Sequence, residues 1–62
     1  MIPQSPESRK ITETAQALIR DFGGVAAIEA HEAAAAARAD GDLEGEAFFL
    51  AVARKIDEFY GR

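Results

Sequence analysis

Two glycine breaks constrain the fold of this chain most strongly. Gly23 and Gly24 stand together, and Gly41 follows later, so that the sequence is divided into three stretches of helical length. Glycine adopts the left-handed conformation that ends helices at little cost. Within each stretch the apolar residues recur at helical spacing, and none shows the alternation typical of a half-buried strand. The sequence therefore predicts an all-α fold.

Start signals give the predicted helices their boundaries. Ser5 and Pro6 are typical of a helix N-terminus, because serine accepts a hydrogen bond from a free backbone N–H and proline fits the first helical position. Asp42 is the expected N-cap of the last helix. The sequence predicts a flexible tail over residues 1–5 and short helices over residues 6–22, 25–39 and 43–60.

The first predicted helix has a single apolar face. Its members recur at offsets of one helical turn. They are Ile11, Ala15, Leu18, Ile19 and Phe22. We expect this face to form part of the core.

The middle segment is dominated by alanine, the best helix former. Six of its alanines share one side of the predicted helix: Ala26, Ala27, Ala30, Ala33, Ala34 and Ala37. A smooth stripe of this kind lets another helix approach closely. Helix propensity at exposed positions selects alanine equally well. The pattern leaves both interpretations open.

The last segment is the most hydrophobic and holds four of the five aromatic residues. Leu43 and Leu50 lie outside its main apolar arc, on a side shared with Arg54 and Asp57. Short connections make successive helices antiparallel neighbours, so residues 6–62 are expected to form one domain. That domain is either a small three-helix bundle or a helical hairpin with the N-terminal helix packed on it.

The chain is short for a stable monomer. It has 62 residues and no cysteine, so no disulfide supports its small core. Small scaffolds of this kind often gain stability by association. We expect a non-catalytic interaction module that forms a homodimer or docks on a larger protein. The expected interface consists of Ala30, Ala33, Ala37, Phe48, Leu50, Phe59 and Tyr60; alternatively, the four large residues among these belong to the core of a monomer.

The acidic stretch DGDLEGE at residues 40–46 resembles the start of an EF-hand calcium loop. Asp40, Asp42, Glu44 and Gly45 match the first ligand positions and the invariant glycine. Ala51 stands where the loop needs its bidentate glutamate. A turn between two helices explains the same residues, because glycine ends one helix and acidic side chains favour the start of the next. We therefore expect an acidic turn without a calcium ion.

No motif in the sequence predicts catalysis or a cofactor. His31 is the only histidine; Ala35 replaces the second histidine of a zincin pair, and Ile28 replaces the glutamate of a di-iron pair. The chain has no cysteine nucleophile and no phosphate-binding glycine loop. A pocket of small-molecule size is hard to build in so short a chain. An acidic metal-binding protein is kept as a third interpretation.

The net charge of −4 argues against a nucleic-acid partner, because phosphate binding needs a clustered basic face and the seven basic residues are scattered. The alternative function is a DNA-associated regulator of helix-turn-helix type, with its turn around Asp40 and Gly41. No apolar run is long enough to span a bilayer, and the N-terminus lacks the apolar centre of a signal peptide. A cytoplasmic protein with no membrane partner is expected.

A spaced pattern runs through the second half of the chain, after an alanine-rich helix and the break at Phe22-Gly23-Gly24. It reads G-D-x-x-G-x-x-x-aromatic-x-x-V-A-x-x-I and is made by Gly41-Asp42, Gly45, Phe49, Val52-Ala53 and Ile56. Over about residues 15–59 it resembles short alphaproteobacterial helical proteins classed as a domain of unknown function. That family usually has tryptophan at the aromatic position. The resemblance implies a bacterial, cytoplasmic, compact helical protein and brings no catalytic residue.

Overall fold

A computed structural model of the protein describes residues 6–61. The described chain is helical and contains no strand. Its elements are α1 (Pro6–Phe22), a short 3-10 turn η1 (Gly23–Val25), α2 (Ala26–Ala39) and α3 (Leu43–Phe59). The all-α prediction is confirmed, and each predicted helix end lies within one residue of the observed end. The predicted tail over residues 1–5, including the Ser5 cap, lies outside the described residues.

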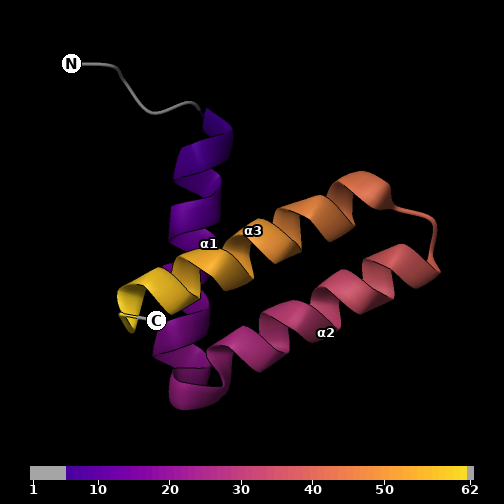
Figure 1. Ribbon diagram of the computed structural model, residues 1–62. Coiled ribbons are helices and arrows are strands. Elements are labelled where there is room, and N and C mark those ends of the chain that lie inside the picture. The colour runs from indigo at the N-terminus through magenta and orange to yellow at the C-terminus, as the bar shows by residue number, and fades with distance from the viewer. Residues whose placement is uncertain (1–5, 62) are drawn as a thin grey trace.

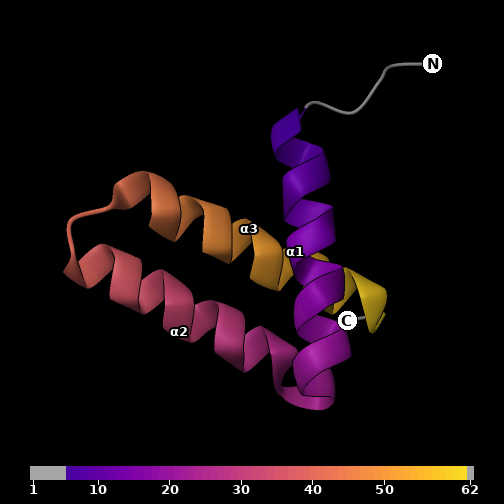
Figure 2. The same ribbon diagram turned by 180° about the vertical axis from the view of Figure 1, so that it is seen from behind.

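The helices form a hairpin with a third helix laid across it. In Figure 1, α2 and α3 run side by side in opposite directions, and α1 passes behind α3. Figure 2 shows the same arrangement from behind, with α1 crossing in front of the hairpin. The most extensive contact is between α2 and α3, and α1 contacts α3 more than α2. The structure therefore has the arrangement of the second predicted form, a helical hairpin with the N-terminal helix packed on it.

The acidic turn ends α2 and starts α3. Gly41 has a φ of 76° and donates its N–H to the Arg38 carbonyl at 3.0 Å, while the Asp42 N–H reaches the Ala37 carbonyl at 2.8 Å. These two bonds engage the Arg38 and Ala37 carbonyls at the end of α2 in a Schellman arrangement. The Asp42 carboxylate then accepts the Gly45 N–H at 2.9 Å. The predicted N-cap is confirmed.

Small side chains make up most of the core. Val52 and Ile56 are the large side chains that are fully buried in the described part of the chain. The other buried core residues are alanines: Ala15, Ala26, Ala30, Ala34 and Ala53. Half of the predicted alanine stripe is thus buried where α2 meets its neighbours in the same chain. Close packing, and not propensity alone, explains these alanines.

Several large apolar side chains stay exposed. Phe22 was expected in the core and is 44% exposed. It is the last residue of α1, after which the chain turns away at Gly23, whose φ is 58°. The large apolar residues that are 44–69% exposed are Phe22, Val25, Ile28, Leu43, Leu50, Phe59 and Tyr60.

Among residues 6–61, no helix combines the length and the apolar character that a membrane-crossing segment needs.

Candidate functional site

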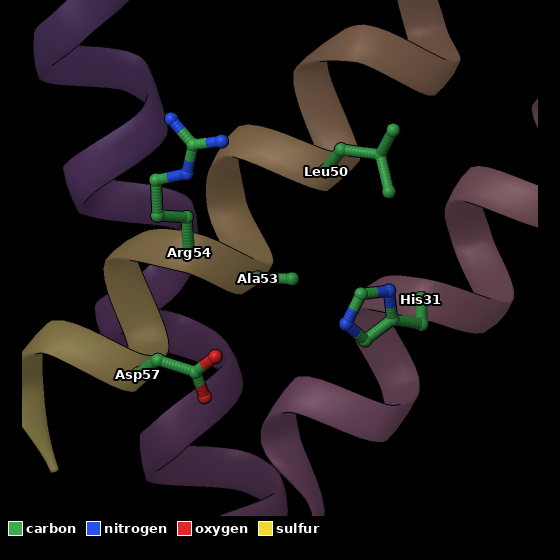
Figure 3. A pocket seen from close by; sticks show the side chains of 5 residues that line it. All are labelled: His31, Leu50, Ala53, Arg54 and Asp57. Atoms are coloured by element: carbon green, nitrogen blue, oxygen red, sulfur yellow. The ribbon is translucent and has the colours of Figure 1, made fainter. Parts of the chain in front are cut away.

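A shallow groove lies between α2 and α3 and has a volume of about 320 Å³. It is lined by His31 of α2 and by Leu50, Ala53, Arg54 and Asp57 of α3. Figure 3 shows α1 behind the hairpin, so the groove is on the face that α1 leaves uncovered. We call this face of the α2–α3 hairpin the free face. A pocket of small-molecule size was expected to be hard to build in so short a chain; the structure has an open groove of this volume between two helices that run side by side.

The positions of the lining residues follow from helix geometry. Leu50, Arg54 and Asp57 are spaced four and three residues apart, so they share one side of α3. Ala53 is buried and small, and it leaves the floor of the groove low between the two helices. The ring of His31 and the side chain of Leu50 both point into the space between the helices (Figure 3).

The charged side chains at the groove have no partner among residues 6–61. Arg54 extends away from Asp57 in Figure 3. Neither side chain forms a hydrogen bond or an ion pair with any residue of the described part of the chain. By contrast, Arg38 contacts Glu46 at 3.9 Å further along the same two helices. Arg54 is therefore an available cation beside an apolar floor.

The residues predicted for the interface lie in different environments. Ala30 has no exposed surface, and Ala33 and Ala37 are half-buried. Phe48 is half-buried against the core, with the ring of Phe49 at 5.2 Å in an edge-to-face contact. The ammonium group of Lys10 lies 6.0 Å from the Phe48 ring. Phe48 therefore faces α1.

Leu50 lines the free face instead. It is two residues from Phe48, which places the two side chains about 160° apart around α3. Phe59 and Tyr60 are about half exposed at the end of α3. The structure does not bring the predicted residues together on one surface. Ala30 is already fully in contact within the chain, and only Leu50 lines the groove.

The interface predicted from the sequence did not include three of the groove residues, nor the exposed Leu43 on the same side of α3. His31, Arg54 and Asp57 line the groove, and Leu43 is the most exposed large apolar residue, at 69%. A signal was present, since Leu43 and Leu50 lie outside the main apolar arc of α3 beside Arg54 and Asp57. What the sequence did not show was that α1 would cover the opposite side.

The structure gives no support to a metal site within residues 6–61. Among the described residues, no three histidine, cysteine, aspartate or glutamate side chains are grouped as metal ligands would be. Partial burial raises the pKa of Glu29, and a hydrogen bond and charge repulsion from Glu32 raise it further. Glu29 is two residues from His31, about 160° around α2, so its carboxylate faces away from the groove.

The chain matches none of the known protein families, none of the curated proteins and none of the solved structures. The resemblance to the alphaproteobacterial helical proteins therefore stays a prediction.

Proposed function

We propose that this chain is a small, non-catalytic interaction module that binds another protein surface through the free face of its hairpin. The proposal rests on the observation that more large apolar side chains are exposed than are fully buried. Val52 and Ile56 are the fully buried large side chains of the described residues, whereas seven large apolar side chains are 44–69% exposed. Two of these seven, Leu43 and Leu50, share one side of α3 on the free face, and apolar side chains that gather on one face are typical of interaction sites.

The groove has the composition of a protein interface. Ala53 and Leu50 supply an apolar floor and wall, and His31, Arg54 and Asp57 supply a polar rim. An apolar centre with a polar rim is the usual anatomy of a protein–protein interface. The groove is open, whereas small-molecule sites usually enclose most of their ligand. A side chain from a partner helix fits this shape better than a substrate does.

The alternative of a helix-turn-helix regulator is less well supported. In that motif the two helices cross at a steep angle, and the N-terminal residues of the second helix contact the bases. Here α2 and α3 run side by side (Figures 1 and 2), and the first turn of α3 carries Glu44 and Glu46. These carboxylates would be repelled by DNA phosphates. A gel shift with random duplex DNA at low salt tests this alternative, because nonspecific binding is mainly electrostatic.

The acidic metal-binding interpretation lacks a cluster of ligands in the described part of the chain. We also propose a cytoplasmic location in a bacterial cell, with a second copy or a larger protein as the partner. These proposals rest on the sequence features described above.

The test of the interaction function is site-specific crosslinking in the native cell. A photo-crosslinking residue is placed at Leu50 on the free face and, as a matched control, at Glu13, which is exposed on α1. We expect covalent protein adducts from position 50 and few from position 13. Equal crosslinking from both positions, or none from position 50, would contradict the proposal.

A further inference from the structure

We infer that the partner that occupies the free face is a second copy of this chain, with α3 packed antiparallel on α3 of the partner. In this arrangement Leu43 of each copy enters the groove of the other, and Glu44 of each copy pairs with Arg54 of the other. The inference rests on the proposed function, and it names the partner and the residues that make the contact.

Shape is the first argument. Leu43, at 69% exposed, protrudes from the same helix that forms one wall of the groove. Leu43 and Ala53 are ten residues apart, which is about 15 Å along a helix at 1.5 Å per residue. A two-fold axis near the middle of this interval brings each leucine over the partner's groove. A two-fold interface makes every contact twice, so one protruding side chain and one groove on each copy suffice.

The surface between the two features allows close approach. Leu43, Ala47 and Leu50 are spaced four and three residues apart and share one side of α3. Ala47 is exposed and would lie near the two-fold axis. A small residue at that point lets two helices approach toward the short end of the usual range of about 8–10 Å.

Charge complementarity is the second argument, and it favours a second copy over an unrelated protein. The end of α3 that carries Leu43 is acidic, whereas the groove carries the unpaired cation Arg54. Antiparallel packing sets Glu44 of one copy near Arg54 of the other. Without such pairing, two copies that each carry a net charge of −4 would repel one another.

Glu44 is the acid that is free to make this pair. Asp42 is engaged in capping α3, and Glu46 contacts Arg38. Glu44 is exposed, is adjacent to Leu43 and forms no hydrogen bond or ion pair within residues 6–61. Asp57 also lines the groove, at the end nearer the C-terminus of α3. With the two-fold axis midway between Leu43 and Ala53, Asp57 lies past the first residue of the partner's α3 and does not face Glu44.

The experiment is a charge swap followed by sedimentation velocity on the pure full-length chain. Arg54→Glu and Glu44→Arg each place like charges together at two symmetric contacts, so we expect each to weaken the dimer about tenfold or more. The double variant Arg54→Glu with Glu44→Arg restores opposite charges and is expected to recover most of the affinity. Glu13→Arg on α1 makes the same change of charge outside the interface and should leave the dimer unchanged.

Leu43→Ala removes the protruding side chain without changing charge and should also weaken the dimer. Circular dichroism on each variant confirms that the helices remain folded. A wild-type chain that is monomeric at high micromolar concentration would overturn the inference, as would a double variant no stronger than the single ones. If the pure chain is monomeric but position 50 crosslinks to a different protein in the cell, the inference of self-association is wrong and the proposed function stands.

Discussion

Among single residues, Asp42 and Gly45 depend on one another most directly. The Asp42 carboxylate accepts the Gly45 N–H, and a Cβ atom on residue 45 would overlap that carboxylate. Glycine costs helix stability inside a first turn, so its presence needs a reason. The cap supplies that reason, because only glycine lets the aspartate approach so closely. The acidic turn is thus explained by capping geometry.

The dependence of these two residues can be measured as a double-mutant cycle. Asp42→Ala should cost about 1 kcal/mol through the loss of the cap. Gly45→Ala alone should be nearly neutral, since it gains about 1 kcal/mol of helix propensity and displaces a cap of similar value. In the Asp42→Ala background, Gly45→Ala should stabilise by about 1 kcal/mol, because no carboxylate is left to displace. Urea denaturation of the four proteins measures the free energies of unfolding.

If the two substitutions change the free energy of unfolding additively, residue 45 does not constrain the cap.

Calcium provides a control on the same turn. The melting temperature of the wild-type chain should not change with calcium, and a rise of several degrees that is lost in Asp40→Ala would identify a cation site instead.

Among the elements, α2 depends most on small side chains. Ala26, Ala30 and Ala34 repeat every fourth residue and are buried, whereas Ala35 on the other side is exposed. Buried alanines let α2 lie close to its neighbours, and exposed ones contribute helix propensity. The two interpretations of the alanine-rich segment therefore apply to different sides of one helix.

Matched substitutions separate the two roles. Ala30→Leu should destabilise the chain by about 1–3 kcal/mol, because a larger side chain at a fully buried site forces the helices apart. Ala35→Leu adds the same atoms at an exposed site and should change stability by less than about 0.5 kcal/mol. Thermal unfolding followed by circular dichroism compares them. Equal effects at the two sites would mean that α2 does not pack through Ala30 as described.

At the scale of the whole molecule, one face of the hairpin is covered and the other is open. α1 crosses behind α3 and contacts the Phe48 side of the hairpin. The free face keeps the groove, Leu43 and Leu50 in solvent. A core with two fully buried large side chains is small for a chain of this length. Association through the free face would therefore contribute to folding stability as well as to recognition.

Coupling between folding and association predicts a melting temperature that depends on protein concentration. Over about a hundredfold range of concentration, the wild-type melting temperature should rise by several degrees, because mass action favours the folded dimer. Leu43→Ala should show a smaller rise. Differential scanning calorimetry at a series of concentrations measures both. A melting temperature that is independent of concentration would show that the chain folds as a monomer.

The sequence by itself determined the helices and their ends. The periodic apolar residues, the glycines at positions 23 and 41 and the cap at Asp42 act over a few residues, and the structure confirms the helix ends that they predict. The tertiary structure decided which side of each helix is buried. Phe22 and Leu18 belong to one sequence stripe, yet Leu18 packs against the core and Phe22 is exposed. The physical reason is the range of the interactions. Caps and turns are hydrogen bonds between residues a few positions apart, whereas the crossing of α1 and the open groove depend on how whole helices pack against one another.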